Sequence, residues 1–129
     1  MTYKLTMAYD GTNYHGWQRQ KNGITVQEVL EDVLTEIAGE SVVVTGCSRT
    51  DAGVHARVYV CSFTMKTTIP ADKIPFVLNT KLPDDIRAYK CEIMHDSFNA
   101  RFETVSKAYE YKILNRCFHD PLERNFAWH

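Results

Sequence analysis

The stretch between Thr25 and Gly39 constrains the fold most, because it has a single apolar stripe at the helical period. Thr25 suits an N-cap, Glu28 completes a capping box three residues later, and Gly39 suits the C′ position. The stripe consists of Val26, Val29, Leu30, Val33, Leu34 and Ile37. The polar residues off the stripe are Gln27, Glu28, Glu31, Asp32 and Glu36. The pattern predicts an amphipathic helix with an acidic outer face that points away from any nucleic acid.

The segments around this helix predict a small antiparallel sheet. A second helix is expected to begin near Asp72, as its N-cap, and to turn Ile74, Val77 and Leu78 toward the sheet. Strand-like segments span residues 3–9, 42–45, 57–65 and 86–94. The order strand, helix, strand, strand, helix, strand is that of an α+β, ferredoxin-like (split βαβ) fold with the helices on one face. Residues 106–114 alternate as a strand does and could add a fifth strand.

The third strand-like segment, residues 57–65, is apolar on both faces. Val58 and Val60 would point one way, and the alternate side chains, among them Tyr59 and Phe63, would point the other way. This predicts a central strand that is covered on both sides, or covered by a partner.

The loop between the second and third strands, residues 46–56, holds the densest set of chemical groups. Arg49, Asp51 and His55 lie within seven residues of the sequence, the first two between Gly46 and Gly53 and the third just after Gly53. Side chains of these types do not form a hydrophobic core, and loops fixed on rigid strands are where functional groups concentrate. Asp51 has two interpretations: a turn aspartate that hydrogen-bonds to its own backbone near Gly53, or a carboxylate that the Arg49 guanidinium keeps ionised for catalysis.

The loop of residues 12–23 also has two interpretations, and the spacing of its residues favours neither of them. It can be a surface loop that Tyr14 and Trp17 pin to the core. It can also be an RNA-facing loop, in which aromatic rings stack on bases and Arg19 contacts phosphate.

Composition excludes several classes of protein. The chain has 129 residues, 44% of them hydrophobic and 24% charged, which suits one soluble domain. No apolar run approaches the roughly 20 residues of a membrane span, and the first residues do not resemble a signal peptide. The cysteines, widely spaced, fit reduced cytoplasmic thiols better than a disulfide framework or a metal site: Cys47, Cys61, Cys91 and Cys117. The net charge of −1 is unexpected for an RNA-binding protein.

Several motifs together resemble the TruA family of tRNA pseudouridine synthases. Residues 48–56, Ser-Arg-Thr-Asp-Ala-Gly-Val-His-Ala, match the family signature except for Ser48, where the family usually has glycine. Residues 9–20, from Tyr-Asp-Gly-Thr to Gly-Trp-Gln-Arg-Gln, resemble its opening motif. Residues 98–102 (Phe-Asn-Ala-Arg-Phe) and 107–111 (Lys-Ala-Tyr-Glu-Tyr) resemble two further motifs.

The resemblance implies an isomerase that converts uridine to pseudouridine in the anticodon stem-loop of tRNA, at positions 38 to 40. It makes Asp51 the catalytic nucleophile and pairs Arg49 with it, and it leaves open whether Asp51 adds to the sugar, attacks the base or assists formation of a glycal. It also places Tyr109 against the uracil, although Tyr109 taken alone fits a core strand tyrosine. His55, Arg19 and Arg101 complete the expected substrate-binding set. The family implies a homodimer, and the reaction calls for no cofactor and no metal.

The family has two ferredoxin-like halves, so residues 1–129 are expected to be the N-terminal catalytic half. The missing half would supply part of the basic surface, which answers the unexpected net charge. Two other classes remain open: a catalytically inactive RNA-binding half-domain and, from fold alone, a small metabolite-binding regulatory domain. A thiol enzyme built on Cys47 and His55 has only their proximity in its favour.

Overall fold

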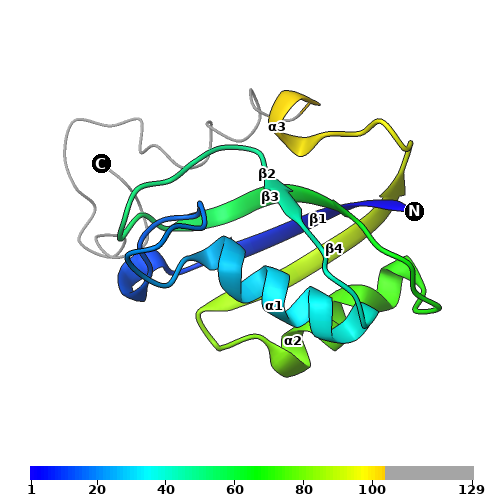
Figure 1. Ribbon diagram of the computed structural model, residues 1–129, viewed down its shortest axis with the longest axis horizontal. Coiled ribbons are helices and arrows are strands. Elements are labelled where there is room, and N and C mark those ends of the chain that lie inside the picture. The colour runs from blue at the N-terminus through cyan, green and yellow to red at the C-terminus, as the bar shows by residue number, and fades with distance from the viewer. Residues whose placement is uncertain (104–129) are drawn as a thin grey trace.

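In the computed structural model, which describes residues 1–103, a four-stranded antiparallel sheet packs on two helices (Figure 1). The strands are β1 (Thr2–Tyr9), β2 (Val44–Gly46), β3 (Ala56–Thr64) and β4 (Ile86–Met94), in the order β2-β3-β1-β4. The helices are α1 (Val26–Ala38), α2 (Ile74–Lys81) and the short α3 (Ala100–Glu103), and 3₁₀ turns span Gly11–Asn13 and Ala71–Lys73. This confirms the predicted ferredoxin-like fold. The predicted fifth strand, 106–114, lies outside the described residues.

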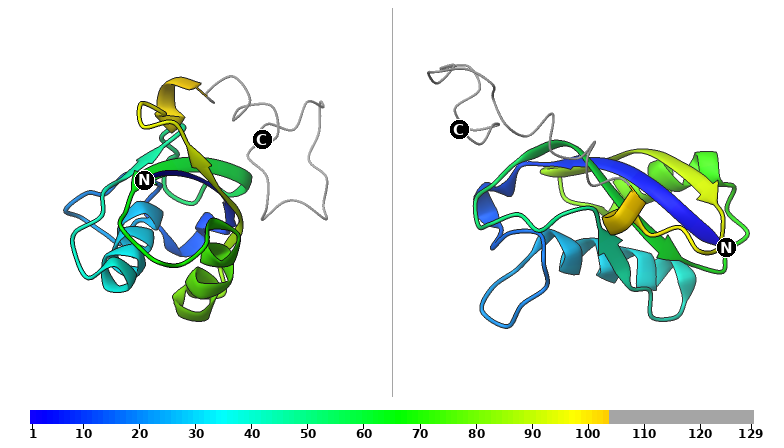
Figure 2. Two further views of the ribbon diagram at one scale, coloured as in Figure 1. Left: turned by 90° about the vertical axis from the view of Figure 1, so that its right-hand side faces the viewer. Right: turned by 90° about the horizontal axis from the view of Figure 1, so that it is seen from above.

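The core lies between the sheet and helices α1 and α2, which lie side by side beneath one face of the sheet (Figure 2). Side chains from all these elements are fully buried there: Leu5, Met7, Leu30, Leu34, Leu78 and Ile86. α3 lies on the opposite face, where the Ala100 N–H donates to Ser62 Oγ at 3.1 Å (Figure 2). The sequence did not predict this third helix.

Helix α1 begins and ends where its caps predict. The Thr25 hydroxyl accepts the Glu28 N–H at 3.3 Å, and Gly39 adopts the left-handed conformation, with φ of 73°, just after the last turn. The expected all-acidic outer face is wrong in part, however, because Gln27 and Glu31 are both only 7% exposed.

The start of α2 differs from the prediction. Asp72 is exposed and does not cap a helix, because it lies inside the 3₁₀ turn that precedes α2, where the Lys73 N–H donates to Pro70 O at 2.9 Å. An N-cap needs an extended backbone, and the helical turn denies it. Pro75 sits in the first turn of α2, as expected.

Strand β3 is central, between β2 and β1, as its sequence predicts. Tyr59, Cys61 and Phe63 point into the core, whereas Val58, on the other face, is 40% exposed. Strand β2 begins two residues later than expected, at Val44, because the Val42 N–H is used by the Thr35 hydroxyl of α1 at 3.1 Å.

Candidate functional site

The signature loop, defined here as residues 47–55, connects β2 to β3 and is anchored at Thr50. The Thr50 hydroxyl is hydrogen-bonded to the Tyr9 hydroxyl at 2.8 Å, and the Thr50 carbonyl accepts the Trp17 N–H at 3.2 Å. Three residues on, the Gly53 N–H donates to Tyr14 O at 3.2 Å. The two motifs that are far apart in the sequence, residues 9–20 and 48–56, therefore form one structural unit.

Two glycines allow this close packing. A side chain at Gly11 would overlap the Val54 carbonyl, and one at Gly16 would overlap the Thr50 carbonyl. Gly16 also has φ of 84°, which disfavours any residue with a Cβ. The opening motif thus needs glycine at both points where its backbone meets the signature loop.

A cluster of aromatic rings packs next to the signature loop and is hydrogen-bonded to it. The ring centroids of Trp17 and Tyr59 are 4.4 Å apart, and those of Tyr9 and Tyr59 are 5.5 Å apart in an edge arrangement. The Tyr59 hydroxyl donates to the Ser48 carbonyl and accepts the Ser48 N–H. Trp17 is 1% exposed and Tyr14 is 7% exposed. Of the two interpretations of residues 12–23, the pinned loop is the correct one for these rings, which are too buried to stack on bases.

Asp51 is exposed at the middle of the signature loop. It opens a β-turn in which the Val54 N–H donates to Asp51 O at 3.1 Å and Gly53 has φ of 78°. Asp51 is therefore a turn residue, but among the described residues its carboxylate has no hydrogen bond or ion pair. The expected pairing with Arg49 is not formed there, and Arg49 is itself exposed.

Each end of the signature loop borders a hollow. The first hollow, of about 580 Å³, lies beside β2 and is lined by Cys47, Ser48 and Arg49 and by Arg101 of α3. The second, of about 710 Å³, is bordered by His55 and Arg57 and by residues of β1 and β4. Asp51 lies between these two ends of the loop in the sequence.

The first hollow brings together two of the predicted site residues, Arg49 and Arg101, which are 52 positions apart (101 − 49). Both are exposed, so their guanidinium groups can reach an anion. The second hollow adds a cation that was not predicted as a site residue, Arg57, whose signal was the alternation of β3. Arg87 also borders this hollow, but its Nη2 lies 2.7 Å from Asp84 Oδ1 and its Nη1 donates to Asn79 O at 3.2 Å, so its guanidinium is engaged within the protein.

His55 is mostly buried and helps to fasten the opening motif. It is 9% exposed, and its Nδ1 accepts the Gly11 N–H at 2.8 Å and lies 3.1 Å from Asp10 Oδ1. Burial by itself would raise the pKa of Asp10, but the hydrogen bonds from Thr12 and the nearby His55 ring outweigh it, and that pKa is lowered. In the neutral ring Nδ1 accepts from Gly11, whereas a protonated ring would donate to Asp10.

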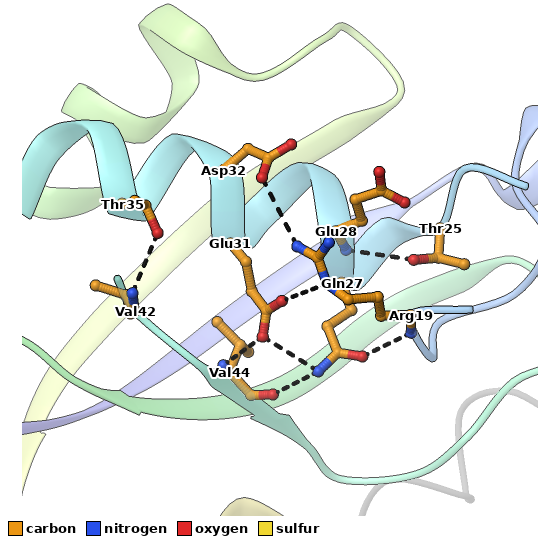
Figure 3. Close-up of polar contacts among 9 residues, drawn as sticks. All are labelled: Arg19, Thr25, Gln27, Glu28, Glu31, Asp32, Thr35, Val42 and Val44. Carbon is orange, nitrogen blue, oxygen red and sulfur yellow. Dashed lines mark hydrogen bonds and ion pairs between the residues drawn. The ribbon is translucent and has the colours of Figure 1, made fainter. Parts of the chain in front are cut away.

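Arg19 has a protein partner. Its Nε lies 2.9 Å from Glu31 Oε1, and its Nη2 lies 3.7 Å from Asp32 Oδ1, so its guanidinium packs on α1 (Figure 3). The hydrogen bond to Glu31 raises the pKa of Arg19. That Arg19 contacts substrate stays a prediction. The remaining predicted residue, Tyr109, lies outside the described residues.

Metal-ligating clusters and membrane spans are both absent from residues 1–103. No group of three or more histidine, cysteine, aspartate or glutamate side chains in that range could hold a metal ion. None of the helices described there is long and apolar enough to cross a membrane.

Comparison with known proteins identifies the family. The family described as "tRNA pseudouridine synthase" matches residues 5–103, which include the opening motif and the signature loop. The chain is 51% identical over 125 residues to tRNA pseudouridine synthase A of Thermoanaerobacter sp. (strain X514), covering 97% of the chain and 51% of that relative. It is also 51% identical to tRNA pseudouridine synthase A of Clostridium acetobutylicum and 44% identical to tRNA pseudouridine synthase A 2 of Clostridium perfringens.

The chain therefore belongs to the tRNA pseudouridine synthase family. It spans about half the length of the curated relatives that it matches, 51% of both the Thermoanaerobacter and the Clostridium acetobutylicum proteins.

Proposed function

We propose that this chain is the half of a tRNA pseudouridine synthase that carries the catalytic aspartate, Asp51. The observation that supports this most is the contrast between Asp51 and its neighbours. Thr50 and Gly53 are hydrogen-bonded to the opening motif, while the Asp51 carboxylate is exposed and has no partner in the described part of the chain. A reactive group held on a fixed backbone, with its own side chain unengaged, suits a catalytic role.

The reaction converts uridine to pseudouridine without redox change. The N1–C1′ bond breaks, the uracil turns, and a C5–C1′ bond forms; C5 loses its proton to solvent and N1 gains one. Asp51 acts as the nucleophile: its carboxylate adds to the substrate nucleotide and leaves again when the new bond has formed. Nothing is gained or lost overall, so no cofactor enters the proposal.

The substrate-binding groups of the proposal are those that the structure leaves open to solvent. Arg49 and Arg101 border the hollow beside β2 and would contact phosphates of the RNA. The family resemblance adds Tyr109, to stack on the uracil. The proposed targets are uridines 38 to 40 of the anticodon stem-loop, which must leave the base stack at a cost of a few kcal/mol. A homodimer in the cytoplasm, where tRNA is modified, completes this proposal.

The test is Asp51→Asn in a two-half protein, made by joining the chain to the part of the Thermoanaerobacter relative that it does not cover. Tritium release from tRNA labelled at C5 of uridine measures the reaction. We expect the variant to lose activity and to keep its affinity for tRNA, because the change removes a charge and conserves size. Asp72→Asn, at an exposed aspartate of the 3₁₀ turn that precedes α2, is the matched control and should behave as wild type.

Turnover by Asp51→Asn near the wild-type rate would refute the assignment of Asp51. Tight tRNA binding by the unsubstituted two-half protein, with no product, would instead favour an inactive RNA-binding protein.

A further inference from the structure

The side chains of Arg19, Gln27 and Glu31 form a hydrogen-bonded network, the polar strut, which the sequence did not predict (Figure 3). Glu31 is 7% exposed, yet it is charged, and its two carboxylate oxygens serve different elements. Oε1 accepts from Arg19 Nε at 2.9 Å, and Oε2 accepts the Val44 N–H at 2.8 Å. A buried carboxylate is costly unless it is paired and hydrogen-bonded, and here both conditions are met.

Gln27 completes the strut. Its Oε1 accepts the Arg19 backbone N–H at 2.8 Å, and its Nε2 donates to Val44 O at 2.8 Å and to Glu31 Oε2 at 3.3 Å. Two side chains of α1 therefore hold the N–H and the C=O of Val44, at the start of β2. The same two side chains hold the end of the opening loop at Arg19.

The strut connects to the signature loop through Trp17. The Trp17 carbonyl accepts the Gln27 N–H at 3.0 Å, and the Trp17 N–H donates to Thr50 O at 3.2 Å. One peptide segment thus joins the first turn of α1 to the residue that precedes Asp51. The other route is covalent, since β2 leads from Val44 into the signature loop.

We propose that Arg19 and Glu31 are positioning residues of the catalytic loop, and that Arg19 serves the reaction through Glu31 rather than by contacting RNA. Together with Gln27 they hold Val44, which leads into the signature loop, and the segment of Trp17, which is hydrogen-bonded to Thr50 next to Asp51. The role in catalysis rests on the proposed function, whereas the role of the strut in fixing the loop does not.

The two roles of Arg19 make opposite predictions for its partner. If Arg19 contacted a phosphate, Arg19→Met would weaken tRNA binding and lower the slope of log affinity against log salt by about one. Glu31→Gln would then leave tRNA binding unchanged or strengthen it, because a negative charge is removed. If Arg19 is a positioning residue, both substitutions act alike.

The experiment compares Arg19→Met, Arg19→Lys and Glu31→Gln in the two-half protein. We expect Arg19→Met and Glu31→Gln to lower kcat about tenfold or more, with the KM, the affinity for tRNA and its salt dependence unchanged. Arg19→Lys, which keeps the cation but not the planar fork, should restore part of the rate. The controls Lys81→Met and Glu36→Gln break an exposed ion pair of 3.0 Å elsewhere on α1 and α2 and should change nothing.

A second readout needs no activity. In the ¹⁵N-labelled 129-residue chain, Arg19→Met and Glu31→Gln should speed hydrogen exchange at the Val44 and Trp17 amides, while the two controls leave both unchanged. If the unsubstituted two-half protein is inactive, the proposed function is refuted, and hydrogen exchange at the Val44 and Trp17 amides still tests whether the strut holds the loop. Unchanged exchange at Trp17, or weaker tRNA binding by Arg19→Met with a normal Glu31→Gln, would overturn the inference.

Discussion

The hydroxyls of Tyr9 and Thr50 are hydrogen-bonded at 2.8 Å, so the last residue of β1 holds the residue that precedes the exposed Asp51. Tyr9 is 4% exposed, and its ring packs against Trp17 with centroids 6.3 Å apart. The bond therefore joins a rigid part of the core to the backbone of the signature loop.

Removing this bond should lower activity more than stability. Tyr9→Phe keeps the ring packing and loses one hydroxyl, so denaturant unfolding should show a loss of about 1 kcal/mol. Tritium release should fall further, because Asp51 is less well placed. Thr50→Val should resemble Tyr9→Phe, Thr50→Ser should retain the bond, and the double variant Tyr9→Phe/Thr50→Val should add little to either single change. Additive losses in the double variant would show that the bond is not the common cause.

Three glycines with left-handed backbone provide a graded test of the contact between the two motifs. A Cβ at Gly39 or Gly53 would meet only open space, so alanine there should cost about 1–2 kcal/mol of backbone strain. Alanine at Gly16 adds a collision with the Thr50 carbonyl to the same strain, and its cost should be clearly greater. Urea unfolding of the three variants checks this order. Equal costs at Gly16 and Gly39 would mean that the close approach at Thr50 does not exist in solution.

Stability should fall as the pH rises above the ordinary thiol pKa, because of buried cysteines. Burial raises the pKa of Cys91 to about 12, with Glu92 adding to the effect, from an ordinary value of 9.0; burial also raises the pKa of Cys61. The unfolded chain loses these protons first, so the stabilisation is complete below the ordinary value and is lost as the pH rises toward the folded pKa. Cys91→Ala should flatten the decline in the free energy of unfolding, measured by urea titration at each pH. A decline of the same slope in Cys91→Ala would assign it to other groups.

Residues 1–129 alone are expected to fold, to self-associate and to turn over tRNA poorly. α1 and α2 cover one face of the sheet, whereas Val58 on the other face is 40% exposed. An apolar surface of this kind is stabilised by burial against a second layer. Size-exclusion chromatography with light scattering, with tRNA binding at two salt concentrations and tritium release, checks all three statements. A strictly monomeric chain that turns over tRNA would contradict this view of the half-domain.

The elements of the fold that have a regular apolar pattern in the sequence could be predicted from that pattern. α1 was predictable because its apolar stripe and both caps are local, and the strand order followed from the order of elements. The burial of Gln27 and Glu31 was not predictable, because a polar residue beside the stripe gives no indication of its partners. Those partners, Arg19 and Val44, lie on separate elements.

The candidate site shows the same division. The signature loop could be found from its residue types, but whether Trp17 faced RNA or the core depended on the packing of Tyr9 and Tyr59, which are distant in the sequence. The prediction that Asp72 caps α2 was wrong for a local reason, because Asp72 lies in the 3₁₀ turn before α2 and N-cap propensity does not indicate such a turn.

The hydrogen bonds to Val44 also determine how the sheet can grow. An edge strand with free N–H and C=O groups is a template for another strand. At β2 these groups of Val44 are occupied by Gln27 and Glu31, and the Val42 N–H is occupied by Thr35. The other edge strand, β4, is occupied in the same way at Ala88, because Asn79 of α2 accepts the Ala88 N–H at 2.8 Å and donates to the Ala88 carbonyl at 2.9 Å. Within residues 1–103 a side chain from a helix therefore blocks each edge at one residue, and a fifth strand, from the same chain or from another, would have to pair away from Val44 at β2 or away from Ala88 at β4.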